Sequence, residues 1–315
     1  MTASFKDVHD QYLAVIEDEM ARIDSYQTVP LFYDPIQYML DLKGKRIRPL
    51  LTLLSAMAFG AKVDEAKYAA AAVELLHNFT LVHDDIMDND ATRRGKPTIH
   101  TKWDIGTAIL AGDGLMGLAF RKLLQSPRGN IPAMMGRLTE TMIVICEGQG
   151  LDKMFENMED VSLDTYLDMI ARKTAVLIEM ACELGGMAAE ANNDSIQILK
   201  EFGYALGMGF QIQDDYLDIT ADESILGKKI GSDLQMRKKT ILTILLRELT
   251  GSNDFFEMSL PDFKTLMEKY EVPDRVNKMY LEYFSTAYNK LAAIPHNDHT
   301  IHLKELTDFL RNRSW

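Results

Sequence analysis

Apolar residues return at the three- to four-residue spacing of a helix through almost the whole chain, and this periodicity restricts the fold most strongly. The strict apolar–polar alternation typical of strands and the usual hairpin turn signals are missing. The sequence therefore predicts an all-α fold, a bundle of roughly ten or more helices. The apolar helical runs cover about residues 5–25, 49–59, 64–88, 101–124, 132–155, 163–191, 194–219, 241–249, 262–270, 273–291 and 300–310.

Capping residues indicate where several helices begin. Asp34 precedes Pro35, the pattern of a capping side chain followed by proline in the first helical turn, and Asp194 is a candidate N-cap. The polar residues 89–97 are expected to form a loop. The residues 221–239, rich in glycine and charge, are expected to form a mobile loop that closes over a ligand.

The chain organisation favours one domain. Its 315 residues would allow about two domains, but no linker rich in Pro, Gly and Ser interrupts the helical pattern, so we predict a single domain over residues 1–315. Cys146 and Cys182 lie in apolar helical patterns, and we expect buried thiols in a reducing compartment. The pattern of a signal peptide and an apolar run long enough to span a membrane are both missing, so we expect a cytoplasmic protein without a membrane span.

Two acidic runs of the same form dominate the polar residues. Asp84-Asp85-Ile86-Met87-Asp88 ends one apolar run, and Asp214-Asp215-Tyr216-Leu217-Asp218 ends another. Carboxylates four residues apart lie on the same face of a helix and repel each other unless a cation sits against them. Mg²⁺ prefers such hard oxygen ligands and completes its shell with water and phosphate oxygens. Either run alone is compatible with a solvated helix end, whereas the two together predict half-sites for one polyphosphate.

The net charge of −13 limits the partners. Nucleic acids bind to basic surfaces, so we expect no nucleic-acid partner. An anionic substrate would be repelled as well, unless metal ions neutralise the carboxylates locally.

Basic residues gather in four clusters that would suit a diphosphate. Guanidinium groups match phosphate oxygens in a bidentate geometry. Each cluster alone is also typical of an ordinary charged surface. The clusters are Lys45 with Arg48, Arg93 with Arg94, Arg172 with Lys173, and Lys228, Lys229, Lys238 and Lys239.

The order of these motifs resembles the trans-isoprenyl diphosphate synthases, the head-to-tail prenyltransferases. The resemblance spans about residues 40–245 and rests on five motifs in sequence. They are Lys-Gly-Lys-Arg-Ile-Arg-Pro at 43–49, Asp-Asp-Ile-Met-Asp with Arg-Arg-Gly at 84–95, Arg-Lys-Thr-Ala at 172–175, Phe-Gln-Ile-Gln-Asp-Asp-Tyr-Leu-Asp at 210–218, and Gly-x-Asp at 231–233 followed by Lys-Lys-Thr at 238–240.

The resemblance implies the isoprenoid synthase fold, a helical bundle around a deep central cavity, working as a homodimer. It implies a Mg²⁺-dependent condensation of isopentenyl diphosphate with an allylic diphosphate such as dimethylallyl, geranyl or farnesyl diphosphate. The product most favoured is geranylgeranyl diphosphate, and farnesyl diphosphate is the alternative. A non-catalytic subunit of a heteromeric synthase and a terpene cyclase are disfavoured, because both aspartate runs and the Lys45/Arg48 cluster are intact.

The same resemblance implies roles for individual residues. The ligands of about three Mg²⁺ ions are expected to be Asp84, Asp88 and Asp214. The residues expected to support catalysis are Asp85, Asp215, Asp218 and Lys173. The contacts to the allylic diphosphate are expected from Arg93, Lys173, Lys228 and Lys238. The contacts to isopentenyl diphosphate are expected from Gly44, Lys45, Arg48, His77 and Arg94. The residues beside the reacting carbons are expected to be Thr174 and Gln211.

Glu74 and His77 have the Glu-x-x-His spacing of di-iron bundles, but the second such motif that this site needs is missing. His77 is therefore either a packed helix residue or, by the resemblance, a diphosphate contact. Arg237 stands where the family commonly has glycine before the lysine at position 238.

The length of the product can be related to Phe79 and Thr80. Phe79 lies five residues before Asp84, about 7.5 Å back along a helix, and Thr80 lies on the same face as Asp84. In the family, a large residue followed by a smaller one at these positions resembles the geranylgeranyl type. The alternative is that Phe79 is ordinary core and that residues near Leu115 and Met116 form the floor.

Replacing Phe79 with alanine is expected to lengthen the product, because a small side chain would leave the space below the growing prenyl chain open. Chromatography of the products measures the change. An unchanged product distribution would show that Phe79 is not the floor.

Overall fold

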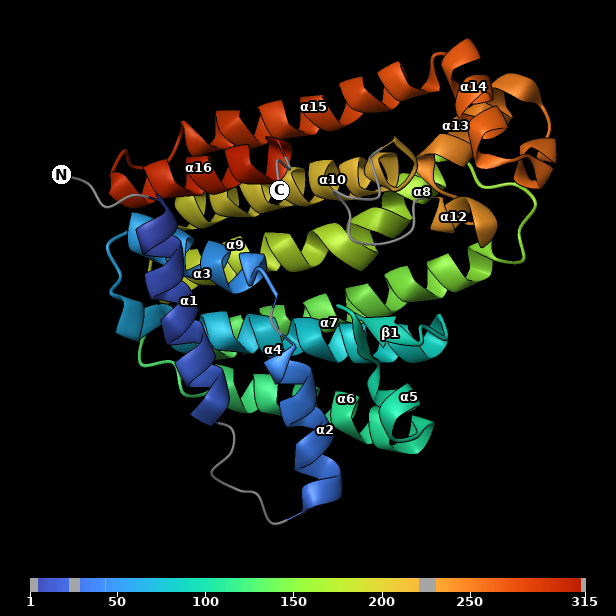
Figure 1. The fold of residues 1–315 in the computed structure, drawn as a ribbon. Coiled ribbons are helices and arrows are strands. Elements are labelled where there is room, and N and C mark those ends of the chain that lie inside the picture. Colours follow the sequence, from blue (N-terminus) through green and yellow to red (C-terminus); the bar gives the residue numbers. More distant parts are fainter. Residues whose placement is uncertain (1–4, 23–28, 43, 221–230, 313–315) are drawn as a thin grey trace. The chain divides into compact units, whose positions relative to one another are not determined.

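The computed structural model describes residues 5–22, 29–42, 44–220 and 231–312 of the chain (Figure 1). The chain divides into two compact units. Unit 1 contains Met1–Met142, Met180–Leu199 and Ile294–Leu303, and unit 2 contains Ile143–Glu179, Lys200–Ala293 and Lys304–Trp315. Helices supply almost all of the regular structure in the described residues, which confirms the all-α prediction. The single domain stays a prediction.

The N-terminal part of the chain forms the helices of unit 1. They are α1 (Phe5–Ala21), α2 (Pro30–Asp41), α3 (Ile47–Ala58), α4 (Val63–Met87), α5 (Ile99–Lys102) and α6 (Ile105–Leu123). The helices α7 (Ile131–Phe155), α9 (Val176–Ala188), α10 (Asn193–Thr220) and α16 (Asp298–Asn312) supply residues to both units.

The remaining elements belong to unit 2. They are α8 (Leu163–Ile170), a π-helical turn η2 (Ala171–Ala175), α12 (Ser232–Gln235), α13 (Ile241–Thr250), a 3₁₀ turn η3 (Asp254–Glu257), α14 (Leu260–Lys269) and α15 (Val272–Leu291). Their apolar side chains form a core in which α8 packs on α13, and α13 and α14 pack on α15.

Helix α4 is the centre of unit 1. It packs against α1, α3 and α6, and the alanines of its first half, Ala69–Ala72, are fully buried. Alanine has no side chain beyond Cβ, so neighbouring helices approach closely on several sides. This packing fixes the helix whose last turn carries Asp84 and Asp85.

A buried ion pair ties α1 to α6 within unit 1. Lys122 Nζ lies 2.8 Å from Glu19 Oε1, and both side chains are less than a tenth exposed. Lys67 Nζ of α4 lies 3.7 Å from the other oxygen of Glu19. Removing one partner of such a pair leaves a buried charge uncompensated, whereas an exposed pair contributes little.

The loop expected at residues 89–97 contains a short hairpin. Strand β1 (Thr92–Arg93) pairs antiparallel with β2 (Lys96–Pro97). Arg94 and Gly95 connect them with φ angles of 52° and 73°, which is the left-handed backbone of a type I′ turn. The sequence did not predict this hairpin within the expected loop, because Arg-Gly lacks the Asn or Asp that usually marks such a turn.

Several helix boundaries also differ from the prediction. Helix α2 begins at Pro30, so Pro35 lies inside it. Helix α10 begins at Asn193, one residue before the expected cap, and Asn192 Oδ1 accepts a hydrogen bond from Ser195 N at 2.8 Å. In each case an earlier residue, proline at the first turn or asparagine as the cap, starts the helix.

The expected helix at 101–124 is interrupted. Asp104 Oδ1 accepts a hydrogen bond from Thr107 N at 2.9 Å and caps α6, so α5 ends at Lys102. Cys182 is buried as expected, but Cys146 is exposed on α7, which contradicts its prediction. Among the described helices, none combines the length and the apolar composition that crossing a membrane requires.

Candidate functional site

The predicted residues of unit 1 lie on the second half of α4 or beside it, from His77 to Asp88, and we call this group the α4 half-site. It comprises Gly44, Lys45, Arg48, His77, Asp84, Asp85, Asp88, Arg93 and Arg94. The predicted residues of unit 2 form a second group at the carboxyl end of α10, the α10 half-site. It comprises Lys173, Thr174, Gln211, Asp214, Asp215, Asp218 and Lys238.

Asp84 and Asp88 end α4. Both are half-buried, and Asp88 N donates to the carbonyl of Asp84 at 2.8 Å, which keeps them one helical turn apart. The carboxyl end of a helix carries partial negative charge, so two carboxylates there favour a bound cation. In the described part of the chain, no three His, Cys, Asp or Glu side chains form a complete metal cluster. Mg²⁺ fits this pair, because substrate phosphates and water normally complete its shell.

Asp85 has a different environment from its neighbours. It is 3% exposed, and Arg93 holds its Oδ1 with Nε at 2.7 Å and Nη2 at 2.6 Å. Burial raises the pKa of Asp85, and Arg93 opposes that rise. Asp85 therefore anchors Arg93, and the hairpin that carries it, to the end of α4.

Three of the residues predicted to bind isopentenyl diphosphate, Gly44, Arg48 and Arg94, lie close to His77 or to one another. Arg48 Nη1 lies 3.2 Å from His77 Nε2. A Cβ atom added to Gly44 would lie 2.5 Å from Arg94 Nη2, so only glycine lets the Arg94 guanidinium lie on this backbone. Lys45 is exposed on the same segment. The structure thus brings these cationic groups together within unit 1.

The electrostatics of this cluster favour an anion. Burial, followed by the positive charges of Arg48 and Arg94, holds the pKa of His77 well below its usual range. His77 is therefore neutral near pH 7, and its Nε2 accepts the hydrogen bond from Arg48. Burial also lowers the pKa of Arg48 to about 10. Guanidinium groups that are desolvated and repel one another are stabilised by a bound anion.

Phe79 and Thr80 occupy the face of α4 one to one and a half turns before Asp84. Phe79 is 6% exposed, and its ring packs edge-on against His83 with 4.8 Å between ring centroids. Thr80 Oγ1 donates to the carbonyl of His77 at 2.8 Å. Gly112 of α6 lies against His83, where an added Cβ would be 2.2 Å from Nε2. This contact was not predictable from the sequence, because nothing in the local pattern pairs Gly112 with His83.

A pocket of about 200 Å³ lies at the α10 half-site. Its lining contains most of the residues that the motifs predicted for unit 2. It also contains Asp233 of the Gly-x-Asp motif, and Asp152 and Tyr166, which the motifs did not indicate. The predicted residues in the lining are Lys173, Thr174, Gln211, Asp214, Asp215 and Lys238.

Asp215 organises one wall of this pocket. Its Oδ2 accepts from Tyr166 Oη at 2.6 Å, and its Oδ1 accepts from Gln211 Nε2 at 2.8 Å. Gln211 Oε1 in turn accepts from Thr174 Oγ1 at 3.0 Å. Burial raises the pKa of Asp215 to about 7. This carboxyl group is held by the protein, whereas Asp214 is half-buried and lines the pocket.

Lys173 and Thr174 lie on the π-helical turn Ala171–Ala175. Such turns are rare in proteins, and those that occur are often found at functional sites. A Cβ on Gly148 of α7 would lie 2.4 Å from Lys173 N, and one on Gly207 of α10 would lie 2.6 Å from Ala175 Cα. Both glycines admit the wider turn. A glycine inside a helix is unfavourable by about 1 kcal/mol relative to alanine. The presence of Gly148 and Gly207 inside helices was therefore the sequence signal for this close approach.

Asp218 holds the backbone at Gly231 and Asp233. It is 1% exposed, its carbonyl accepts from Gly231 N at 2.8 Å, and its Oδ2 accepts from Asp233 N at 3.3 Å. Lys238 Nζ lies 3.9 Å from Asp233 Oδ1. Lys228 lies outside the described residues, as does the segment 221–230 of the expected loop.

Arg237 adopts the backbone conformation that glycine would take. Its φ is 54°, in the left-handed region, and its Nη2 forms an ion pair with Glu257 Oε1 at 2.8 Å. A non-glycine residue in this region is strained by about 1–2 kcal/mol. The departure from the family pattern therefore leaves a glycine-like bend before Lys238.

Comparison with known proteins identifies similar chains. The polyprenyl synthetase family model matches residues 29–265. The geranylgeranyl diphosphate synthase of Methanosarcina mazei is 38% identical over 292 residues, 90% of this chain and 90% of that protein. The enzyme of the same name from Sulfolobus acidocaldarius is 46% identical over 230 residues, 72% of this chain and 70% of that protein. A crystal structure of geranylgeranyl pyrophosphate synthetase from Pyrococcus horikoshii aligns with a TM-score of 0.93 and 31% identity, covering 98% of both chains.

The raised pKa of Asp215 predicts a specific pH dependence of stability. The folded chain holds this proton up to about pH 7, and the unfolded chain releases it near pH 4. The stabilisation is therefore complete below about pH 4 and is lost as the pH rises towards 7. Replacing Asp215 with asparagine should remove up to about 1.4 kcal/mol per pH unit from the slope in this window.

Urea unfolding between pH 4 and 7 measures this slope. The control is Asp168→Asn, which changes an exposed carboxylate on α8. Equal slopes for the wild type and Asp215→Asn would contradict the assignment.

Proposed function

We propose that this chain, which belongs to the polyprenyl synthetase family, condenses isopentenyl diphosphate with allylic diphosphates to make geranylgeranyl diphosphate. The observation that carries the proposal is the α4 half-site. There, a cluster of guanidinium groups around Gly44 and His77 adjoins a helix end that carries Asp84 and Asp88. Such a site suits diphosphates with Mg²⁺. The geranylgeranyl diphosphate synthases among the relatives support the same product.

The guanidinium groups around Gly44 and His77 are proposed to bind isopentenyl diphosphate. Arg48 and Arg94 would donate hydrogen bonds to its phosphate oxygens, and Lys45 would contact the diphosphate from the exposed side. Gly44 has no side chain, so its backbone leaves room for the Arg94 guanidinium. His77 would remain neutral and orient Arg48 through their 3.2 Å contact. Planar guanidinium groups fixed by such contacts lose little freedom when they bind phosphate.

The carboxylates Asp84, Asp88 and Asp214 are proposed to hold Mg²⁺ at the allylic diphosphate. When bound, the ions would neutralise the diphosphate and stabilise the charge that grows on the leaving group. Lys173 and Lys238, with Arg93 and Lys228, would add fixed positive charge to the same diphosphate. Thr174 and Gln211, already linked to Asp215, would lie beside the reacting carbons.

These groups suit a reaction through an allylic cation. The allylic C–O bond breaks and pyrophosphate leaves, and the double bond of isopentenyl diphosphate attacks the resulting carbocation. The new chain then loses a proton, which the departing pyrophosphate accepts. The protein must bind both diphosphates, stabilise the leaving charge and exclude water that would quench the cation. These tasks require no protein nucleophile.

A homodimer is also proposed. Helix α6 exposes Ile105, Ile109 and Leu110, which are 58%, 44% and 51% exposed. Ile105 and Ile109 are four residues apart on one face of the helix, and Leu110 lies next to Ile109. Such exposed apolar surfaces are typical of association surfaces. The cytoplasmic location stays a prediction from the sequence, and the number of about three Mg²⁺ ions stays a prediction from the family resemblance.

Incubation with labelled isopentenyl diphosphate, each allylic primer and Mg²⁺, followed by sizing of the products, tests the activity. We expect geranylgeranyl diphosphate. Asp84→Asn and Asp214→Asn should each lower kcat by about 10²-fold or more. Asp64→Asn, at the opposite end of α4, is the matched control and should retain activity. Failure to condense with any primer would reject the proposal.

Sedimentation velocity tests the dimer. Ile109→Glu should shift the protein from dimer to monomer, because the carboxylate would have to be desolvated in the interface. Ile301→Glu alters another exposed isoleucine, on α16, and should leave the dimer intact. A monomeric wild type would contradict the proposal.

A further inference from the structure

We propose that Arg46 is a positioning residue, which holds the segment Gly44–Arg48 in the conformation that binds isopentenyl diphosphate. The inference rests on the proposed function of the α4 half-site and adds a residue to which the motifs assigned no role. Arg46 acts through Glu74 of α4, and its own guanidinium is too deeply buried to reach a substrate.

The backbone at Arg46 needs support. Its φ is 49°, in the left-handed region, directly before the first residue of α3. Residues other than glycine and asparagine rarely adopt this conformation, which costs an L-residue about 1–2 kcal/mol. This bend orients the residues on either side of it, Lys45 and Arg48. Contacts of the Arg46 side chain must therefore compensate for the strain.

The side chain of Arg46 supplies these contacts inside unit 1. Its Nη1 donates to Glu74 Oε1 at 2.6 Å, and its Nη2 donates to the carbonyl of Leu40 at 2.7 Å. The side chains of Arg46 and Glu74 are each 2% exposed. Asn78 Nδ2 also lies 3.2 Å from Glu74 Oε1 and orients it. A single buried guanidinium thus joins α2, the segment before α3, and α4.

Arg46 and Arg48 each contact a residue of α4. Arg46 reaches Glu74, and Arg48 reaches His77 three residues further along α4. Positions three apart lie on the same face of a helix. The Arg46–Glu74 pair therefore sets the register in which Arg48 meets His77. If the pair is lost, Arg48 and Gly44 shift relative to His77 and Arg94.

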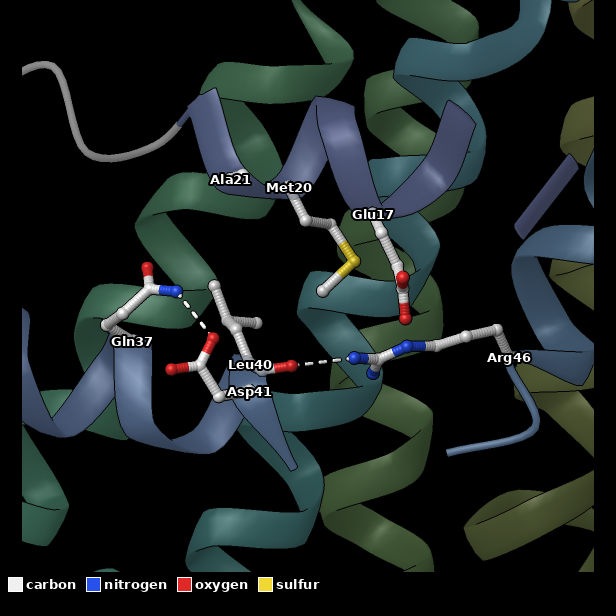
Figure 2. Close-up of a pocket in the computed structure, with 7 residues that line it drawn as sticks. All are labelled: Glu17, Met20, Ala21, Gln37, Leu40, Asp41 and Arg46. Carbon is white, nitrogen blue, oxygen red and sulfur yellow. Dashed lines mark hydrogen bonds between the residues drawn. The ribbon is translucent and has the colours of Figure 1, made fainter. Parts of the chain in front are cut away.

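The third nitrogen of Arg46 borders a pocket. Figure 2 shows the guanidinium below Glu17 and Met20 of α1, with Leu40 and Asp41 of α2 beside it. The pocket has a volume of about 300 Å³, and Arg46 Nε, buried at its wall, has no hydrogen-bond partner. Truncation of Arg46 would therefore extend this pocket towards Glu74, with room for a guanidinium ion.

Steady-state kinetics of Arg46→Ala, Arg46→Lys and Glu74→Gln test the inference. Each change should raise the KM for isopentenyl diphosphate about ten- to hundredfold, with a much smaller effect on kcat and on the KM for the allylic diphosphate. Arg46→Lys and Glu74→Gln preserve the size of the side chain, so they test the inference even if Arg46→Ala does not fold. Millimolar guanidinium chloride should partly restore the KM of Arg46→Ala and leave that of Glu74→Gln unchanged.

Lys122→Met is the matched control, because it removes an equally buried ion pair, with Glu19, elsewhere in unit 1. It should lower the melting temperature without a selective change in the KM for isopentenyl diphosphate. The inference is overturned if the folded variants of Arg46 and Glu74 keep the wild-type KM, or if Lys122→Met raises it equally. A wild type without condensation activity would instead reject the proposed function.

Discussion

Negative charge at the carboxyl ends of α4 and α10 is the constraint on which the rest of the site depends. A helix end of this kind is already partially negative, and each of these helices ends in a run of three aspartates. The two units compensate differently. In unit 1 a guanidinium, that of Arg93, binds Asp85. In unit 2 the hydroxyl of Tyr166 binds Asp215, whose pKa burial raises to about 7. The carboxylates that remain half-buried, Asp84, Asp88 and Asp214, are the ones suited to bound cations.

The two runs have the same Asp-Asp-x-x-Asp spacing, and corresponding aspartates have partly similar surroundings. The second aspartate of each run, Asp85 or Asp215, is buried and held by hydrogen bonds from its own unit. The last aspartates differ. Asp88 is half-buried beyond the end of α4, whereas Asp218 is buried and holds the backbone at Gly231. A helix rotates successive side chains by about 100°, so neighbouring carboxylates point to different surroundings. Identical residue types therefore acquire different protonation and different partners.

Sequence reasoning predicted the helices, which the structure confirms, because helical periodicity is a local property. The charged motifs are local as well, and the roles of the candidate residues in them stay predictions. Sequence reasoning failed where a local signal was weak or was overridden. The turn at Arg94 lacks the residues that usually mark a hairpin. Arg237 has a left-handed backbone conformation that is typical of glycine and unusual for arginine. Contacts between distant segments were also missed. Arg46 with Glu74 and Gly148 with Lys173 are pairs that no spacing rule connects. Such contacts arise from packing, and periodicity gives no information about which helices become neighbours.

The amino-acid sequence by itself determined that this chain is helical, that it carries two acidic runs with basic clusters, and that this combination resembles the prenyl diphosphate synthases. Only the tertiary structure decided which carboxylates are buried, which guanidinium groups converge on His77, and that Arg46 is joined to Glu74. The reason is physical. Residue type sets the charge and the hydrogen-bonding capacity of a side chain, whereas desolvation and the choice of partner depend on what packs against it.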